Sequence, residues 1–310
     1  MIIDLISTYR NMVVNSKVSQ EDIDKCVLDA KNSNSILCIP YFIRPDLRVY
    51  QNAGKNCKGE LGRGGEIYPD KECIEEMLIV MQKNLNKALQ NDNIDNFFKM
   101  RFGGPIVSLP GLIDLVVENY FGRYNGQKKE EEFYHVKDGY TMVNLSDFKG
   151  NGCAMCTKRA LASHVLLSVV ENDKCLKTIF PYKSTYIKSS VNSDISDLKK
   201  VAGAHAFCGL FDKNDGTMFI YDPSIHLYFK TLSGDEKRFP GIYKLKQYEK
   251  ENLGNNKAIM PTSIYCELNQ NLKPLNYPAY GSSTYLQKMK SEFHSNELEH
   301  WNLKKDIFIR

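Results

Sequence analysis

The sequence predicts an α+β fold, in which helices come first and one antiparallel sheet follows. Three observations favour this class. Residues 70–89 carry apolar side chains at spacings of three and four, which is the pattern of an amphipathic helix. A strongly apolar helix is expected at about residues 154–170, and short runs rich in β-forming residues come after it. The chain has 310 residues, 42% of them hydrophobic, so it is large enough to bury a substantial core.

The composition argues against a nucleic-acid-binding protein, a membrane-spanning protein and a disulfide-rich secreted protein. The chain has 41 Lys and Arg against 37 Asp and Glu, and the basic residues form no dense block. It therefore has few clustered positive charges that could bind the phosphates of a nucleic acid. No apolar run is long enough to span a bilayer, and Asp4 and Arg10 interrupt the segment that a signal peptide would need. Nine scattered cysteines fit reduced thiols better than a disulfide framework. We expect a cytoplasmic protein that binds no nucleic acid and has no membrane span. Specialised export as an effector and the oligomeric state stay open.

The first 125 residues are expected to form a mainly helical N-terminal region. A short apolar run, "SILCIPYFI", is followed by the glycine-rich "NAGKNCKGELGRGGE", which predicts a long loop. Asp70 can cap the amphipathic helix that follows this loop. A second helical patch, "LPGLIDLVVENYF", precedes the polar "GRYNGQKKEEE", which is typical of solvated surface and marks a boundary near residue 125.

Residues 126–250 are expected to hold the core of the fold. After the apolar helix come four β-rich runs, "LKTIFPY", "AHAFCGLFD", "TMFIYDP" and "HLYFKTL". The sequence "DKNDG" between the second and third runs predicts a hairpin, because Asp-Gly supplies the positive φ of a tight turn. These two runs should therefore be antiparallel neighbours. Residues 251–310 are expected to be a C-terminal extension with a terminal helix near residues 284–300.

The start of the apolar helix offers a candidate nucleophile. Cys156 falls in the first turn, where the helix dipole and unused backbone N–H groups favour thiolate over thiol. A thiolate nucleophile needs an imidazole beside it and a third group to orient that ring. His164 cannot serve, since eight residues along one helix give roughly 12 Å of rise. His205 on one strand and Asp222 at the end of the next can meet on one face of the hairpin.

These motifs resemble the bacterial transglutaminase-like branch of the papain-like cysteine enzymes. The resemblance covers about residues 148–232 and depends on three motifs in order: Cys156 with Ala160 and Leu166-Leu167, then His205-Ala206-Phe207, then Tyr221-Asp222-Pro223. It implies a papain-like (transglutaminase-like) core, in which a central helix packs on an antiparallel sheet. The catalytic residues would then be Cys156, His205 and Asp222.

The resemblance also implies a mechanism and a substrate class. The thiolate of Cys156 would attack an amide carbonyl of a protein or peptide and form a thioester. His205 would protonate the departing amine, while Asp222 would hold the imidazole in the right tautomer. Water would then give deamidation or peptide hydrolysis, and an amine would give cross-linking. No cofactor and no metal are implied. The backbone N–H of Cys156 would be one oxyanion donor, and the sequence does not identify a second.

Two departures from the family pattern leave alternatives open. Lys158 stands where the family often has a glutamate, and Gly152 lies further from the nucleophile than expected. The second departure makes Cys153 an alternative nucleophile.

Other functions remain as alternatives. One is a catalytically inactive binding module on the same fold. Another is that Cys153 and Cys156 form half of a zinc or redox site, although no second Cys-x-x-Cys pair is present. His226 could replace His205 only if the strand register differed.

Overall fold

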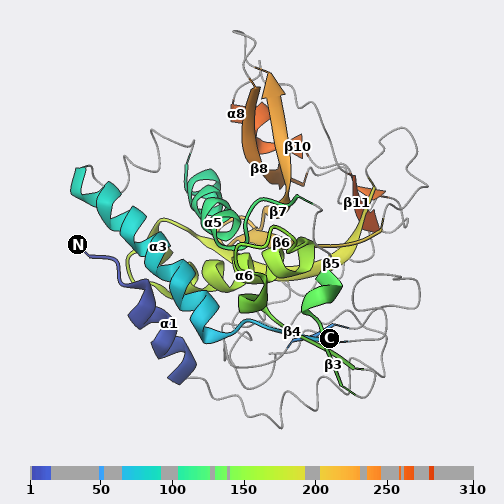
Figure 1. Cartoon of the computed structure of the whole chain (residues 1–310). Coiled ribbons are helices and arrows are strands. Elements are labelled where there is room, and N and C mark those ends of the chain that lie inside the picture. Colours follow the sequence, from blue (N-terminus) through green and yellow to red (C-terminus); the bar gives the residue numbers. More distant parts are fainter. Residues whose placement is uncertain are drawn as a thin grey trace.

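The protein is a mixed helix and sheet structure, which confirms the predicted α+β class (Figure 1). The computed structural model describes residues 2–14, 49–51, 65–91, 104–125, 130–137, 140–192, 203–230, 236–245, 258–259, 262–268 and 279–282. Among these residues no helix combines the length and the apolar character needed to cross a membrane.

Four long helices dominate the described part of the chain. They are α1 (Leu5–Val14), α3 (Lys71–Asn91), α5 (Pro105–Phe121) and α6 (Cys156–Asn172), and the short helical segments are η2 (Glu130–Phe133), η3 (Leu145–Phe148), η4 (Leu176–Thr178) and α8 (Ile264–Leu268). The helices predicted near residues 70–89, 109–121 and 154–170 are confirmed as α3, α5 and α6. The Asp70 carboxylate accepts the backbone N–H of Cys73 at 3.1 Å and so caps α3, as expected.

Two sheets are described. In the larger sheet, β10-β8-β7-β6-β5-β11-β9, neighbouring strands pair antiparallel. Its strands are β5 (Tyr182–Asn192), β6 (Gly203–Asp212), β7 (Met218–Lys230), β8 (Glu236–Lys244), β9 (Ala258–Ile259), β10 (Thr262–Ser263) and β11 (Ala279–Ser282). The smaller sheet, β1-β2-β4-β3, contains one parallel pair, β2 with β4. Its strands are β1 (Val49–Gln51), β2 (Gly65–Tyr68), β3 (His135–Lys137) and β4 (Tyr140–Asn144).

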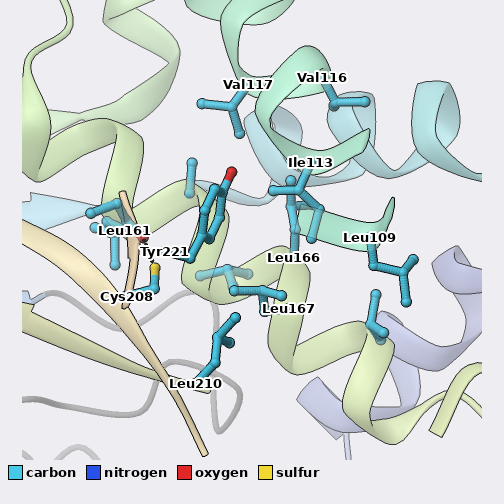
Figure 2. Packing of buried hydrophobic residues seen from close by; sticks show 14 of the residues in the cluster. Leu109, Ile113, Val116, Val117, Leu161, Leu166, Leu167, Cys208, Leu210 and Tyr221 are labelled. Carbon is cyan, nitrogen blue, oxygen red and sulfur yellow. Dashed lines mark hydrogen bonds between the residues drawn. The ribbon is translucent and has the colours of Figure 1, made fainter. Parts of the chain in front are cut away.

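Helix α6 lies at the centre of the hydrophobic core. Every residue from Thr157 to Glu171 is buried. Strands β5, β6 and β7 contact the helix, and so do α1, α3 and α5 (Figure 1). In Figure 2, Leu166 and Leu167 lie among side chains of α5 and of the sheet. A helix covered by other elements is apolar on most sides, which explains why Ser163, His164 and Ser168 are the only polar residues between positions 160 and 170.

Two strand predictions need correction. The run "LKTIFPY" forms η4 and a short connection, and β5 begins only at Tyr182. The cause is Asp173, whose carboxylate accepts the N–H groups of Cys175 and Leu176 at 2.9 and 3.0 Å and so stabilises a helical turn. Residues 218–223 of the run "TMFIYDP" and residues 226–230 of the run "HLYFKTL" belong to one strand, β7, whose pairing with β8 is interrupted by a bulge between Asp222 and His226.

The predicted division of the chain at residues 125 and 250 stays a prediction. Buried residues of α1, α3 and α5 belong to the same hydrophobic cluster as α6 and the larger sheet. Strand β2 pairs with β4 across residue 125. The terminal helix predicted near residues 284–300 and the run "SILCIPYFI" lie outside the described residues, as does most of the glycine-rich loop.

Candidate active site

The structure distinguishes between the two cysteines of the "CAMC" segment. Cys156 is the first residue of α6 and follows Met155, whose extended backbone begins the helix. Its side chain is partly exposed, whereas Cys153 is 0% exposed. A nucleophile must reach a substrate, so the exposure favours Cys156 over the alternative Cys153.

The loop before Cys156 is fastened to the end of α5. The N–H groups of Gly150 and Gly152 donate to the carbonyls of Tyr120 and Phe121, both at 2.8 Å, and the Asn125 N–H donates to the Gly152 carbonyl at 3.1 Å. Both glycines have left-handed backbones, with φ of 67° and 65°. A Cβ on Gly152 would lie 2.7 Å from a backbone oxygen. The spacing of this glycine, a departure from the family pattern, thus fits a loop that is tied to another part of the chain.

Three charged side chains hold the same loop from inside the protein. Glu130 accepts the backbone N–H of Met155 and forms an ion pair with Lys158. Arg159 donates from Nε to the Ala154 carbonyl at 2.8 Å. Its Nη2 donates to the carbonyl of Gly122, which follows the end of α5, at 2.6 Å. Glu130 comes from the polar run that the sequence indicated as solvated surface, yet it is buried. That prediction is wrong for Glu130, because its carboxylate has an ammonium and a backbone donor as partners inside the fold.

His205 and Asp222 form a buried pair. The hairpin between β6 and β7 places Cys208 opposite Tyr221, and Gly216 takes the expected positive φ of 71° in the turn. His205 Nε2 lies 2.6 Å from Asp222 Oδ2. The predicted antiparallel neighbourhood of these two strands is therefore confirmed.

The bulge in β7 holds the Asp222 carboxylate in place. Its second oxygen, Oδ1, accepts the backbone N–H and the hydroxyl of Ser224, at 3.0 and 2.7 Å, and the N–H of Ile225 at 3.2 Å. The side chain is fully buried. Four donors, counting His205, fix its position and favour its ionised form. In the sequence, only Pro223 points to the bulge, because proline has no N–H for strand pairing.

The contacts of His205 favour its protonated ring. Burial lowers the pKa of His205, but the charge and hydrogen bond of Asp222, with a side-chain hydrogen bond to Cys156, raise it to about 10. Because Nε2 bonds to Asp222, Nδ1 is the ring nitrogen left for the thiol. The structure thus brings Cys156, His205 and Asp222 together in one chain of contacts. An imidazole beside a thiol, with a third group that orients the ring, is the arrangement that a thiol nucleophile requires.

The other histidines considered from the sequence have different partners. His164 is buried, and its Nδ1 lies 3.1 Å from the Ser184 hydroxyl. Burial and the nearby Lys183 lower the pKa of His164 to about 3, so its ring is neutral. His226 Nε2 lies 3.0 Å from an oxygen of Asp114. His226 therefore does not replace His205 beside Asp222.

Within the part of the chain that the structure describes, one group of side chains has the composition of a metal site. Single donor atoms of Asp114, Glu118 and His226 lie within 4.8 Å of one another. However, Arg238 donates to both carboxylate oxygens of Glu118 at 2.8 Å and lies within 3.0 Å of the His226 ring nitrogens. The guanidinium supplies the positive charge that a cation would bring. We interpret the group as an ion-pair cluster that joins α5 to β7 and β8, and neither cysteine of the "CAMC" segment belongs to it.

No protein-family model, curated protein or solved structure matches the chain. Any statement about function therefore depends on the geometry of the residues around Cys156.

Proposed function

We propose that the protein is a thiol-dependent hydrolase or acyltransferase that acts on an amide of a protein or peptide. Its core would be papain-like, of the transglutaminase-like kind, with Cys156 as the nucleophile. The observation that carries the proposal is the continuous set of contacts from Cys156 through His205 to Asp222. The helix, strand and strand that present these residues occur in the order that the resemblance implies.

Each residue has a role that follows from its contacts. The Cys156 thiolate attacks the carbonyl carbon of the amide, and a C–S bond forms as the carbonyl electrons move to oxygen. The His205 imidazolium donates its proton to the amide nitrogen, the C–N bond breaks, and ammonia or an amine leaves. The remaining thioester is attacked by water, whose proton passes to His205, and the thiolate departs. Asp222 keeps the ring oriented and stabilises its charge throughout.

The oxyanion of the tetrahedral intermediate needs donors near the start of α6. The N–H of Cys156 has no acceptor within the helix, because the first N–H groups of any helix lack one. The N–H of the preceding residue, Met155, is directed to the buried Glu130 carboxylate instead. The helix dipole adds a favourable field for negative charge at this end.

The experiment that tests the proposal measures which cysteine reacts. The native protein is treated briefly with iodoacetamide and digested, and the adducts are located by mass spectrometry in wild type, Cys156→Ala, Cys153→Ala and His205→Ala. We expect one fast adduct on Cys156, retained in Cys153→Ala and slowed strongly in His205→Ala. Uniform labelling of all cysteines, or labelling only after denaturation, would instead support a binding module on the same fold. A fast adduct on Cys153 would show that Cys153, and not Cys156, is the nucleophile.

The reaction type is resolved by a second measurement on the same variants. Peptides that contain glutamine are incubated with the protein, with and without a primary amine. Release of ammonia indicates deamidation, incorporation of the amine indicates cross-linking, and new peptide termini indicate hydrolysis. Whichever activity is found must disappear in Cys156→Ala, because that variant removes the sulfur that forms the thioester.

A further inference from the structure

A buried ion pair lies directly behind the loop that carries Cys156. The side chains of Lys158 and Glu130 are 0% and 2% exposed. The Lys158 ammonium lies 5.2 and 5.4 Å from the ring centres of Tyr134 and Phe148, so its surroundings are largely aromatic. Burying two charges is costly even when they are paired, and such pairs add little to stability. Lys158 lies two residues from a proposed nucleophile in the same helix, and this position indicates a role other than stability.

Glu130 positions the backbone next to the nucleophile. One carboxylate oxygen accepts the N–H of Met155, the residue immediately before Cys156, and the other accepts the Tyr134 hydroxyl at 3.0 Å. This contact fixes the peptide from which α6 starts. It also places a negative charge against the backbone of the residue before Cys156, and a like charge near a thiolate disfavours that thiolate.

Lys158 removes this electrostatic conflict. Its ammonium bonds to the same carboxylate oxygen that accepts from Tyr134, so the pair as a whole carries no net charge. The resemblance would place an acidic residue at position 158. Here the helix carries the cation, and the carboxylate comes from residue 130. The backbone contact is thereby retained without a net negative charge beside the sulfur.

We propose that Glu130 and Lys158 act as a neutral clamp, which positions the peptide before Cys156 and sets the pH range in which the thiol reacts. Both are positioning residues, since neither is exposed to a substrate. This inference rests on the proposed function, because it assumes that Cys156 reacts as a thiolate.

Other charged groups surround the same loop and must be held constant in a test. Arg159 binds the loop carbonyl of Ala154 from within α6. His205 contacts the thiol from β6, with Asp222 behind it. Tyr134 donates to the clamp itself. None of these groups changes in the variants below, so a difference between variants reports the charges of the clamp.

The test is the pH dependence of Cys156 alkylation by iodoacetamide. Lys158→Met leaves the carboxylate charge and should move the midpoint of the rate profile to higher pH by about one unit. Glu130→Gln leaves the ammonium charge, while its amide oxygen can still accept from Met155, and should move the midpoint to lower pH by about one unit. The double variant should return close to the wild-type midpoint.

An exposed ion pair between the loop before Cys156 and helix α3 provides the control. Lys149 and Glu76 are 2.6 Å apart with side chains 55% and 41% exposed, so Lys149→Met should leave the midpoint within about 0.2 units because water screens the change. A purely structural role for the clamp could slow the reaction but could not move the midpoint in opposite directions.

The outcomes separate the clamp from the proposed function. If wild-type Cys156 reacts no faster than the other cysteines, the proposed function fails. If it reacts fast but both single variants keep the wild-type midpoint, or shift it in the same direction, the clamp is refuted alone. If Lys158→Met does not fold, Glu130→Gln and the double variant still test the clamp. Only the clamp predicts that Glu130→Gln lowers the midpoint pH of alkylation and that adding Lys158→Met restores it.

Discussion

Replacing Gly241 with alanine tests whether the bulge in β7 positions Asp222. Gly241 lies directly opposite Asp222 in the register between β8 and β7. A Cβ at this position would lie 2.5 Å from the carbonyl oxygen of Ile225 and 3.2 Å from that of Asp222. Ordinary contact begins near 3.4 Å, so the bulge has to retreat from β8 by about 0.9 Å, the difference between 3.4 and 2.5 Å.

The retreat has two measurable consequences. Overpacking of this size should lower the free energy of unfolding by about 1–3 kcal/mol. Ile225 also donates to the Asp222 carboxylate, so its displacement should disturb the 2.6 Å contact between Asp222 and His205. If the imidazolium loses about 1.4 kcal/mol of stabilisation, the pKa of His205 falls by about one unit, and alkylation of Cys156 should become slower. Urea unfolding measures the first effect, and the rate of Cys156 alkylation at pH 7 measures the second.

Gly111→Ala is the matched control. Gly111 lies in α5, and its added Cβ would meet Pro240, the neighbour of Gly241, at an ordinary 3.9 Å. Alanine in a helix is favoured over glycine by about 0.5–1 kcal/mol, so this variant should be slightly more stable and equally reactive. If Gly241→Ala kept both the urea midpoint and the alkylation rate of wild type, the bulge would not be what holds the carboxylate.

Three further predictions concern the loop and the buried histidines. Gly150→Ala should lower the free energy of unfolding by about 1–2 kcal/mol, because the φ of Gly150 is left-handed while its surroundings are open. Gly152→Ala should lower it by about 1–3 kcal/mol more, because the added Cβ would also clash with backbone. Equal urea midpoints for the two variants would contradict this. Burial lowers the pKa of His164 to about 3, so unfolded chains gain a proton below pH 6.5 that the folded state does not, and stability falls by up to about 1.4 kcal/mol per pH unit towards pH 3. His164→Asn should remove this part of the acid slope in urea titrations between pH 6 and 4, and an unchanged slope would show that His164 is not its source. The pKa of His205 is lowered by burial but raised overall to about 10 by Asp222 and Cys156, so its stabilisation is full below pH 6.5 and is lost as pH rises towards 10. Asp222→Asn should therefore lower stability at pH 6.5 and flatten the decline between pH 7 and 10, and a parallel decline in both proteins would count against the pairing.

The elements that the sequence predicted well are those determined by local patterns. Spacings of three and four residues predicted α3, and the apolar run predicted α6. The Asp-Gly turn joined β6 to β7, and this pairing was enough to bring His205 and Asp222 together. Cys156 followed from its position at the start of α6.

The features that the sequence could not reveal depend on contacts between distant residues. Nothing near Glu130 in the sequence distinguishes it from its exposed neighbour Glu132, because the difference is made by Lys158, 28 residues later. The pairing of His226 with Asp114 spans 112 residues and joins β7 to α5. Contacts of this kind depend on tertiary packing and leave no periodicity in the sequence.

Helix α6 is surrounded by other elements on every side, and this has a consequence for how the site responds to fluctuations. Amide hydrogens in such an element exchange with solvent only when most of the molecule opens, so α6 should belong to the most slowly exchanging cooperative unit of the described fold. Cys156 begins this helix, and the loop before it is bonded to α5. These bonds couple the thiol to the core, so its environment should persist up to the temperature or denaturant concentration at which the core itself melts. A substitution deep in the core, far from the sulfur, would then change how long the site survives without changing how it reacts while folded.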